Sequence, residues 1–162
     1  MNINKILFPT DFSEFNTAAL NYASRLAAES GALLYIVHVN EQSALNASMG
    51  EASYLYASQW EGDVRKTIQD QLSRVRPTAT NVTFEHVCLD GAPVEELLEF
   101  AKREGVDLIV MGSHGRTGLS RLLMGSIAEG VVRRSECPVL VVKQPVVDEE
   151  HVLTSDDLVS HG

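Results

Sequence analysis

Two glycine-rich segments have the residue types that bind a negatively charged group. Gly112-Ser113-His114-Gly115 is followed, after nine further residues, by Gly125-Ser126. Glycine permits positive φ and lets an anion touch the main chain, and a helix beginning at Ser126 would add unpaired N–H groups and a favourable dipole. The segments therefore predict a phosphate or other anion site, although Ser126 with Glu129 also fits a capping box that needs no ligand.

The distribution of charge supports an anion site in the same segment. Residues 108–128 contain two arginines, Arg116 and Arg121, and no acidic residue, whereas the whole chain has a formal net charge of −9. Five acidic residues lie after Lys143, so the chain up to Lys143 carries −4 of that charge. Neither part has the clustered positive charge of a protein that binds nucleic acid or an anionic membrane, so we expect neither partner.

The elements that must position these residues alternate between strands and helices. Apolar runs predict strands over residues 4–9, 32–39, 81–89, 107–111 and 138–143. Helical spacing and caps predict helices from Ser13 to Ser30, over 51–75, from Pro93 to Gly105, and over 126–135. This alternation predicts an α/β fold with a doubly wound, Rossmann-like, five-stranded parallel sheet of order 3-2-1-4-5 and helices on both faces.

The predicted topology brings two parts of the chain together. In doubly wound sheets, ligands bind beyond the carboxyl ends of the strands, where the winding direction reverses. With the order 3-2-1-4-5 that crevice lies between the first and fourth strands. Thr10-Asp11 follows the first of these strands and Gly112–Gly115 follows the fourth. We therefore expect a carboxylate opposite the glycine segment.

Length and composition predict one domain and a tail. A chain of 162 residues, 44% hydrophobic, can bury one core, which we place at residues 1–143. The acidic remainder, 144–162, is expected to be disordered or docked on a dimer partner. We find no apolar stretch of about 18 residues and no apolar leader, so we expect a cytoplasmic protein. Cys88 and Cys137 lack metal spacing and are expected to be reduced thiols.

These motifs resemble the universal stress protein family from about Asn2 to Lys143. The ATP-binding members of that family carry Gly-x-x-Gly, nine residues and then Gly-Ser or Gly-Thr, a pattern met here by Gly112, Gly115, Gly125 and Ser126. Further matching segments are Pro9-Thr10-Asp11-Phe12-Ser13, His38-Val39, Met111-Gly112-Ser113-His114-Gly115 and Pro138-Val139-Leu140-Val141-Val142-Lys143. The glycine pattern is neither the Gly-x-x-x-x-Gly-Lys phosphate loop nor the Gly-x-Gly-x-x-Gly dinucleotide fingerprint.

The resemblance implies a binding site for ATP with Mg²⁺. It implies that backbone groups of Val39 bind adenine, that Pro9 and Met111 wall the base, and that Asp11 faces the ribose or the Mg²⁺. The glycines would let the main chain close around the triphosphate, with N–H groups, the Ser126 hydroxyl and arginine charge nearby. The complete set of implied contacts is Pro9, Thr10, Asp11, Val39, Met111, Gly112, His114, Gly115, Arg116, Gly125, Ser126 and Ile127.

Several of these residues have alternative structural interpretations. Asp11 also fits a turn or cap before the first helix, and a loop His114 would contribute only its backbone. His38, at the end of a buried strand, is expected to be a satisfied core or rim histidine. Tyr54, Tyr56 and Trp60 fit helix packing better than a base-stacking lid.

The function that the resemblance implies is that of a cytoplasmic, ATP-binding regulatory protein of stress responses. An unidentified regulatory protein is its expected partner. No residue is assigned a catalytic role, although slow ATP hydrolysis or autophosphorylation, with Ser126 as acceptor, stays open as an alternative. A dimeric interaction protein that does not use nucleotide is another. The apolar strand 138–143 would lie at the sheet edge, so we expect a homodimer through it, as the resemblance also implies.

Overall fold

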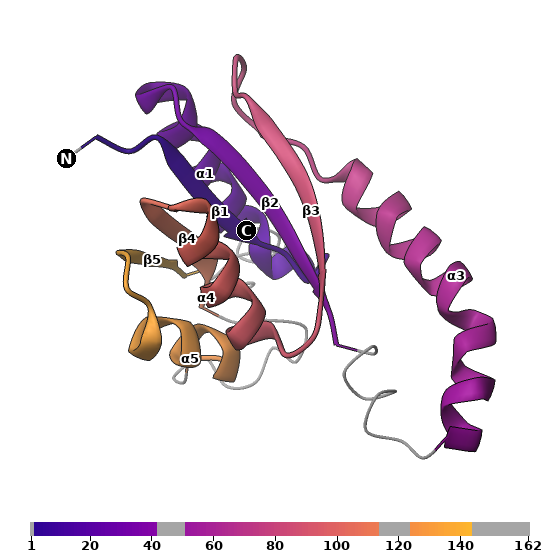
Figure 1. The fold of residues 1–162 in the computed structure, drawn as a ribbon. Coiled ribbons are helices and arrows are strands. Elements are labelled where there is room, and N and C mark those ends of the chain that lie inside the picture. Colours follow the sequence, from indigo (N-terminus) through magenta and orange to yellow (C-terminus); the bar gives the residue numbers. More distant parts are fainter. Residues whose placement is uncertain (1, 42–50, 114–123, 144–162) are drawn as a thin grey trace, which may run out of the picture.

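The chain folds as alternating strands and helices around one sheet (Figure 1). The computed structural model describes residues 2–41, 51–113 and 124–143, and of residues 51–61 the backbone only. The elements in chain order are β1 (Lys5–Pro9), η1 (Glu14–Asn16), α1 (Thr17–Ser30), β2 (Leu33–Asn40), α3 (Glu51–Arg74), β3 (Phe84–Asp90), α4 (Pro93–Glu104), β4 (Leu108–Gly112), α5 (Ser126–Arg134) and β5 (Val139–Val142). The tail 144–162 lies outside the described residues, so its expected disorder or docking stays a prediction.

The five strands form one sheet in the order β3-β2-β1-β4-β5, which confirms the predicted topology. Every neighbouring pair is parallel. The central strand β1 last pairs with β2 at Pro9↔Val37, whereas β2 continues beside β3 to Asn40↔Asp90. The carboxyl end of β2 therefore extends three residues beyond its last pair with β1.

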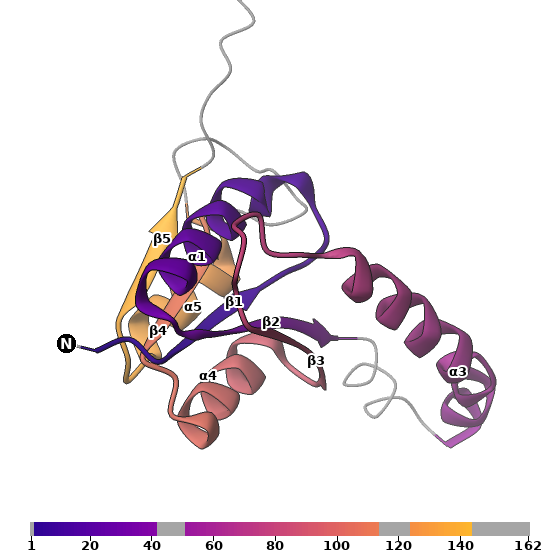
Figure 2. The same ribbon diagram turned by 90° about the horizontal axis from the view of Figure 1, so that it is seen from above.

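Both faces of the sheet are buried under helices. Ile6 and Phe8 of β1 pack with Ala23 of α1 in one apolar cluster, while Leu7 packs with Leu97 of α4 in another that also includes α5. Successive strand residues point to opposite faces, which produces this alternation. Figure 2 shows α1 and α4 on opposite sides of the strands. The predicted helices on both faces are confirmed.

Two predicted helix ends are confirmed, and one strand begins later than predicted. Gly31 (φ 70°) follows α1 and Gly105 (φ 64°) follows α4, both in the left-handed conformation that glycine adopts without strain. β3 begins at Phe84 instead of residue 81. Asn81 has φ 61°, a turn conformation, so the extended chain starts only after it.

The start of the first helix differs from the prediction. A short 3-10 turn, η1, precedes α1, which begins at Thr17, and Ser13 makes no side-chain cap bond. The Ser13 hydroxyl instead donates to Asp11 Oδ1 at 2.6 Å. A carboxylate two residues back therefore competes successfully with the helix for this hydroxyl.

The helix α3 lies beyond β3, and its first turns run away from the sheet (Figures 1 and 2). Ile68 and Leu72, in its second half, are buried, whereas Val64 is 39% exposed. Ile68 and Leu72 therefore pack this part of α3 on the rest of the domain. Among the helices in the described residues, none is both long and apolar enough to span a membrane.

Two glycines inside helices provide a matched test of this packing. A Cβ at Gly62 of α3 would meet no atom within 4 Å, whereas one at Gly130 of α5 would lie 2.9 Å from a methyl carbon of Val94 in α4. Replacing glycine by alanine inside a helix gains about 0.8–1.0 kcal/mol of propensity. Gly62→Ala should therefore raise the free energy of unfolding by about that amount, measured by urea denaturation.

The Gly130→Ala variant should not be stabilised, because overpacking costs about 1–3 kcal/mol and offsets the gain in propensity. An equal stabilisation by both substitutions would show that α4 and α5 are less closely packed than the structure describes.

Candidate functional site

A cavity of about 540 Å³ opens at the carboxyl ends of β1, β2 and β4. Nine predicted nucleotide contacts line it, namely Pro9, Thr10, Asp11, Val39, Met111, Gly112, Gly125, Ser126 and Ile127. The predicted contacts at His114, Gly115 and Arg116, and the nearby Arg121, lie outside the described residues. The structure thus brings every described member of the predicted set to one cavity, at the switch point between β1 and β4.

The amino terminus of α5 forms one end of the cavity. Gly125 is its N-cap, and its N–H donates to the Ser113 carbonyl at 2.8 Å, which holds the helix start against the end of β4. The Glu129 N–H donates to the Gly125 carbonyl at 2.9 Å. The amides of Ser126, Ile127 and Ala128 precede this bond and have no acceptor within the helix. Donors and the positive end of the helix dipole therefore gather where the cavity meets α5.

The predicted capping box at this helix is wrong. Ser126 is the first helical residue, one position after the cap, and Gly125 supplies no side chain for a cap bond. The Glu129 carboxylate pairs instead with Arg133, one turn later, at 3.3 Å. Without a side-chain cap, the first amides of α5 are not engaged by the contacts that a capping box would make.

Asp11 organises the part of the cavity wall that lies between β1 and α1. Its Oδ1 accepts hydrogen bonds from the Ser13 N–H (3.0 Å), the Ser13 hydroxyl (2.6 Å) and the Asn16 amide (2.5 Å). The turn role that the sequence left open for Asp11 is therefore present. Asp11 thus stabilises this turn and also lines the cavity.

Phe12 and His38 support the same wall. Phe12 has φ 65°, an uncommon conformation for a bulky residue, and its ring stacks on His38 with the centroids 4.2 Å apart. His38 is buried, and its Nδ1 lies 2.8 Å from the Thr10 carbonyl oxygen. Because a carbonyl only accepts, Nδ1 carries the hydrogen. His38 is thus the satisfied rim histidine that the sequence predicts.

The end of β2 presents backbone groups to the cavity because β1 stops short of it. The Thr10 N–H donates to the Val37 carbonyl at 2.8 Å, so Val37 faces β1. The Asn40 carbonyl accepts from Gly91 on the β3 side at 3.2 Å. Successive residues of an inner strand face alternate neighbours, so Val39 faces the β1 side, beyond the last β1–β2 pair. Its amide and carbonyl therefore lie at the cavity wall.

Sequence reasoning missed the wall that α3 contributes. Val64, Ile68 and Gln71 line the cavity, and their spacing of four and three residues places them on one helix face. The spacing alone could predict that these three residues share one face of a helix. It could not predict that this face lies against the cavity. Tyr54, Tyr56 and Trp60, considered as packing or lid residues, lie in the part of α3 whose side chains are outside the described residues.

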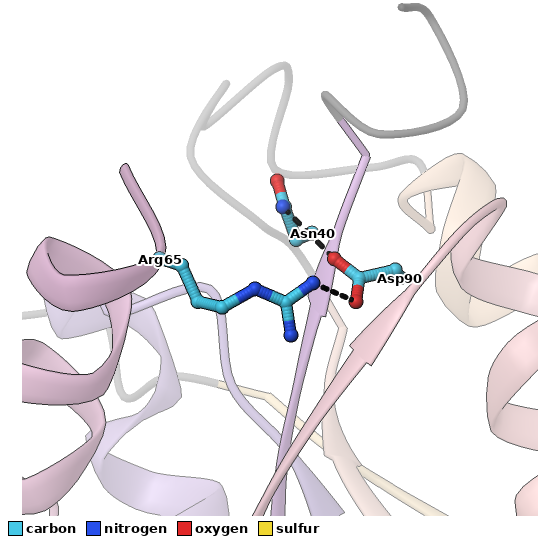
Figure 3. Close-up of polar contacts among 3 residues, drawn as sticks. All are labelled: Asn40, Arg65 and Asp90. Carbon is cyan, nitrogen blue, oxygen red and sulfur yellow. Dashed lines mark hydrogen bonds and ion pairs between the residues drawn. The ribbon is translucent and has the colours of Figure 1, made fainter. Parts of the chain in front are cut away.

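A polar network joins α3 to the ends of β2 and β3 (Figure 3). Asp90 Oδ1 accepts a hydrogen bond from Asn40 Nδ2 at 3.1 Å. Asp90 Oδ2 pairs with an Arg65 guanidinium nitrogen at 2.8 Å. Asn40 is buried and lines the cavity. The network was not foreseen, because its members are 25 and 50 residues apart and form no motif.

The charged groups of this network shift the pKa of the Cys88 thiol. Burial raises the pKa of Cys88, the Asp90 carboxylate raises it further, and the Arg65 guanidinium lowers it by a smaller amount. Cys88 is a free thiol, as is Cys137. A thiol with a raised pKa is a poor nucleophile at neutral pH, so Cys88 is suited to packing rather than to redox chemistry.

Comparison with known proteins identifies relatives over most of the chain. Residues 2–143 match the sequence profile of the universal stress protein family. Universal stress protein MJ0531 from Methanocaldococcus jannaschii is 38% identical over 143 residues, which cover 87% of this chain and 82% of that protein. Universal stress protein MJ0577 from the same organism is 33% identical over 157 residues, 86% of this chain and 94% of that protein.

Solved structures have the same fold. The structure of MJ0577 superimposes with a TM-score of 0.71 at 30% identity and covers 90% of this chain and 99% of that chain. A universal stress protein solved in complex with cAMP has a TM-score of 0.58 at 27% identity and covers 90% of this chain and 100% of that chain. The fold and the family resemblance predicted from the sequence are both confirmed.

The pKa of Cys88 provides a test of the network around it. Replacing Asp90 by Asn removes a negative charge, so Asp90→Asn should lower the pKa of Cys88 and speed its alkylation by iodoacetamide at a given alkaline pH. Arg65→Gln should raise the pKa and slow the reaction. Peptide mass spectrometry would follow Cys88 separately, with Cys137 as the internal control. Equal rates in all three proteins would contradict the described placement of Arg65 and Asp90.

Proposed function

Because this chain belongs to the universal stress protein family, we propose that it binds ATP with Mg²⁺ in the cavity at the carboxyl ends of β1, β2 and β4. Nucleotide occupancy would then bias its dimerisation or its choice of protein partner, as a regulatory protein requires. One observation carries the proposal: nine residues chosen from sequence motifs, on strands and helices far apart in the chain, line the same cavity.

The phosphate end of the nucleotide is assigned to the start of α5. Gly125 and Gly112 line the cavity there, and the Ser126 and Ile127 amides precede the first bond within α5. Such amides and the helix dipole favour phosphate oxygens. The Ser126 hydroxyl would add a further donor. His114, Gly115 and Arg116 belong to the same proposed set.

The adenine end is assigned to β2 and the apolar walls beside it. The Val39 amide and carbonyl, which face the β1 side, supply one donor and one acceptor for the edge of the base. Pro9 and Met111 line the same cavity and offer apolar surface to the base. The cAMP complex of a 27%-identical relative supports the binding of an adenine nucleotide by this fold.

Magnesium would enter with the phosphates rather than at a preformed protein site. Among the described residues, no group of three or more His, Cys, Asp or Glu side chains could hold a metal ion. Mg²⁺ in nucleotide sites commonly uses one or two carboxylates together with phosphate oxygens and water. Asp11, on the cavity wall opposite α5, is the carboxylate that we assign to the ribose or to this ion.

The proposal is for binding and assigns no catalytic residue. Hydrolysis needs a positioned water and a general base. Asp11 Oδ1 instead accepts three hydrogen bonds that hold the β1–α1 connection. ATP turnover is therefore not included in the proposed function.

A homodimer through β5 forms the second part of the proposal. β5 is the last strand of the sheet order, and its Leu140 side chain is 36% exposed. The Pro138 and Val142 carbonyls accept from Ile109 and Ser113 on the β4 side, each at 3.0 Å. By alternation, the backbone groups of Val139 and Val141 face outward and would pair with a second copy.

The nucleotide site can be tested at Gly125. Its φ of −62° and ψ of 150° are accessible to any residue, so Gly125→Val adds bulk beside the phosphates without straining the backbone. Calorimetric titration should find ATP binding by the unchanged protein and a loss of about 10- to 100-fold in the variant, as overpacking implies.

The control for this experiment is Gly62→Val, since Gly62 has open space around it. ATP affinity should be unchanged in the control. Chromatography of nucleotide released by denaturing freshly purified protein would complement the titration. An unchanged protein that binds no ATP, or a Gly125→Val variant that binds it normally, would contradict the proposed site.

The dimer can be tested by two proline substitutions in β5. Val141→Pro removes an N–H that faces outward, whereas Leu140→Pro removes one that faces β4. Sedimentation should find a dimer for the unchanged protein and a folded monomer for Val141→Pro. Leu140→Pro should instead lower the unfolding temperature. A monomeric unchanged protein, or a Val141→Pro dimer of undiminished affinity, would refute pairing through this edge.

A further inference from the structure

The side chains of α3 are described from residue 62 onward, and this part of the helix meets both the sheet and the cavity. Among these described side chains Ile68 and Leu72 are buried, whereas Val64 is 39% exposed although it lines the cavity. In Figures 1 and 2 the helix leaves the sheet toward its first residues. A polar contact one turn before Ile68 therefore lies beside the face of α3 that lines the cavity.

Arg65 makes such a contact. It follows Val64 and lies three residues before Ile68, and its guanidinium pairs with Asp90 Oδ2 at 2.8 Å. The side chains of Arg65 and Asp90 are 57% and 32% exposed, so the pair is partly screened by water. The ion pair matters through its position rather than its strength, because it connects the cavity wall formed by α3 to the end of β3.

The other oxygen of Asp90 connects this pair to the end of β2. Asn40 Nδ2 donates to Asp90 Oδ1 at 3.1 Å, and the Gly91 N–H donates to the Asn40 carbonyl at 3.2 Å. Asn40 is therefore held to the end of β3 through both its side chain and its backbone. Figure 3 shows the side-chain contact. The preceding residue is Val39, whose amide and carbonyl face the cavity on the opposite edge of the strand.

We propose that Arg65, Asp90 and Asn40 are positioning residues for the nucleoside half of the bound nucleotide. The Arg65–Asp90 pair holds α3 as the outer wall of the cavity, and Asp90, through Asn40, holds the end of β2 from which Val39 meets the base. This role rests on the proposed function. It assigns the network to the nucleoside end of the site and not to the phosphate end. The α5 amides and Gly125, at the phosphate end, lie outside the network.

The test compares ATP with AMP, which share the nucleoside half, on the full chain. ATP affinity is measured by calorimetry and AMP affinity by competition against ATP, which extends the measurement to weak binding. Arg65→Gln and Asp90→Asn should each weaken both ligands by the same factor, about two- to fivefold for an exposed ion pair. The double variant should lose no more than the more affected single variant, because the two residues act as one unit.

Two further variants separate positioning from general stability. Arg65→Lys keeps the charge and should retain most of the affinity. Lys102→Gln breaks an ion pair with Glu136 that is also exposed (2.9 Å) but involves no residue of the nucleotide cavity, so it should leave both affinities unchanged. In about 1 M salt, where the Debye length is about 3 Å, the difference between the unchanged protein and Arg65→Gln should shrink.

The outcomes distinguish this role from the proposed function. If the unchanged protein binds neither nucleotide, the proposed function fails and the positioning role fails with it. If it binds both but Arg65→Gln and Asp90→Asn behave like Lys102→Gln, the positioning role alone is overturned. A loss confined to ATP would also overturn it, because the network would then act on the phosphates.

Discussion

The cavity exists because the helices that follow two neighbouring strands, β1 and β4, pack on opposite faces of the sheet. β1 and β4 lie side by side, but α1 packs on the face of Ile6 and Phe8 while α5 packs on the face of Leu7. Helices that leave toward opposite faces cannot cover the edge between their strands, so a crevice remains there. Asp11 stands on one side of this crevice and Gly112 and Gly125 stand on the other. The early end of β1 deepens the crevice and uncovers the last residues of β2.

The connection after β1 is shaped at a local energetic cost. Phe12 has φ 65°, and such a conformation in a residue other than glycine costs about 1–3 kcal/mol. The stacking of Phe12 on His38 and the three hydrogen bonds to Asp11 Oδ1 hold it in place. Backbone strain of this kind is concentrated at binding sites, where the surrounding contacts determine the conformation. Contacts within the protein therefore determine the shape of this cavity wall.

Much of the fold was predictable from the sequence, because buried strands and glycine helix ends leave local signals. The sheet order and the helix ends at Gly31 and Gly105 agree with expectation. Hydroxyl caps were predicted less well, since Ser13 donates to Asp11 and Ser126 lies inside its helix. A short hydroxyl side chain has several nearby partners, and only the folded geometry selects one. The Arg65–Asp90–Asn40 network joins three separate elements and leaves no periodic signal at all.

The hydrogen bond between the Gly125 N–H and the Ser113 carbonyl joins the two ends of the segment that carries the glycine motif. It brings the end of β4 and the start of α5 to one point, so the length of chain between them is not needed to span any distance in the fold. The entropy of closing a loop grows only slowly with its length. The sheet alone therefore does not require nine residues between Gly115 and Gly125, so a constraint on that spacing would come from what the segment binds rather than from the fold.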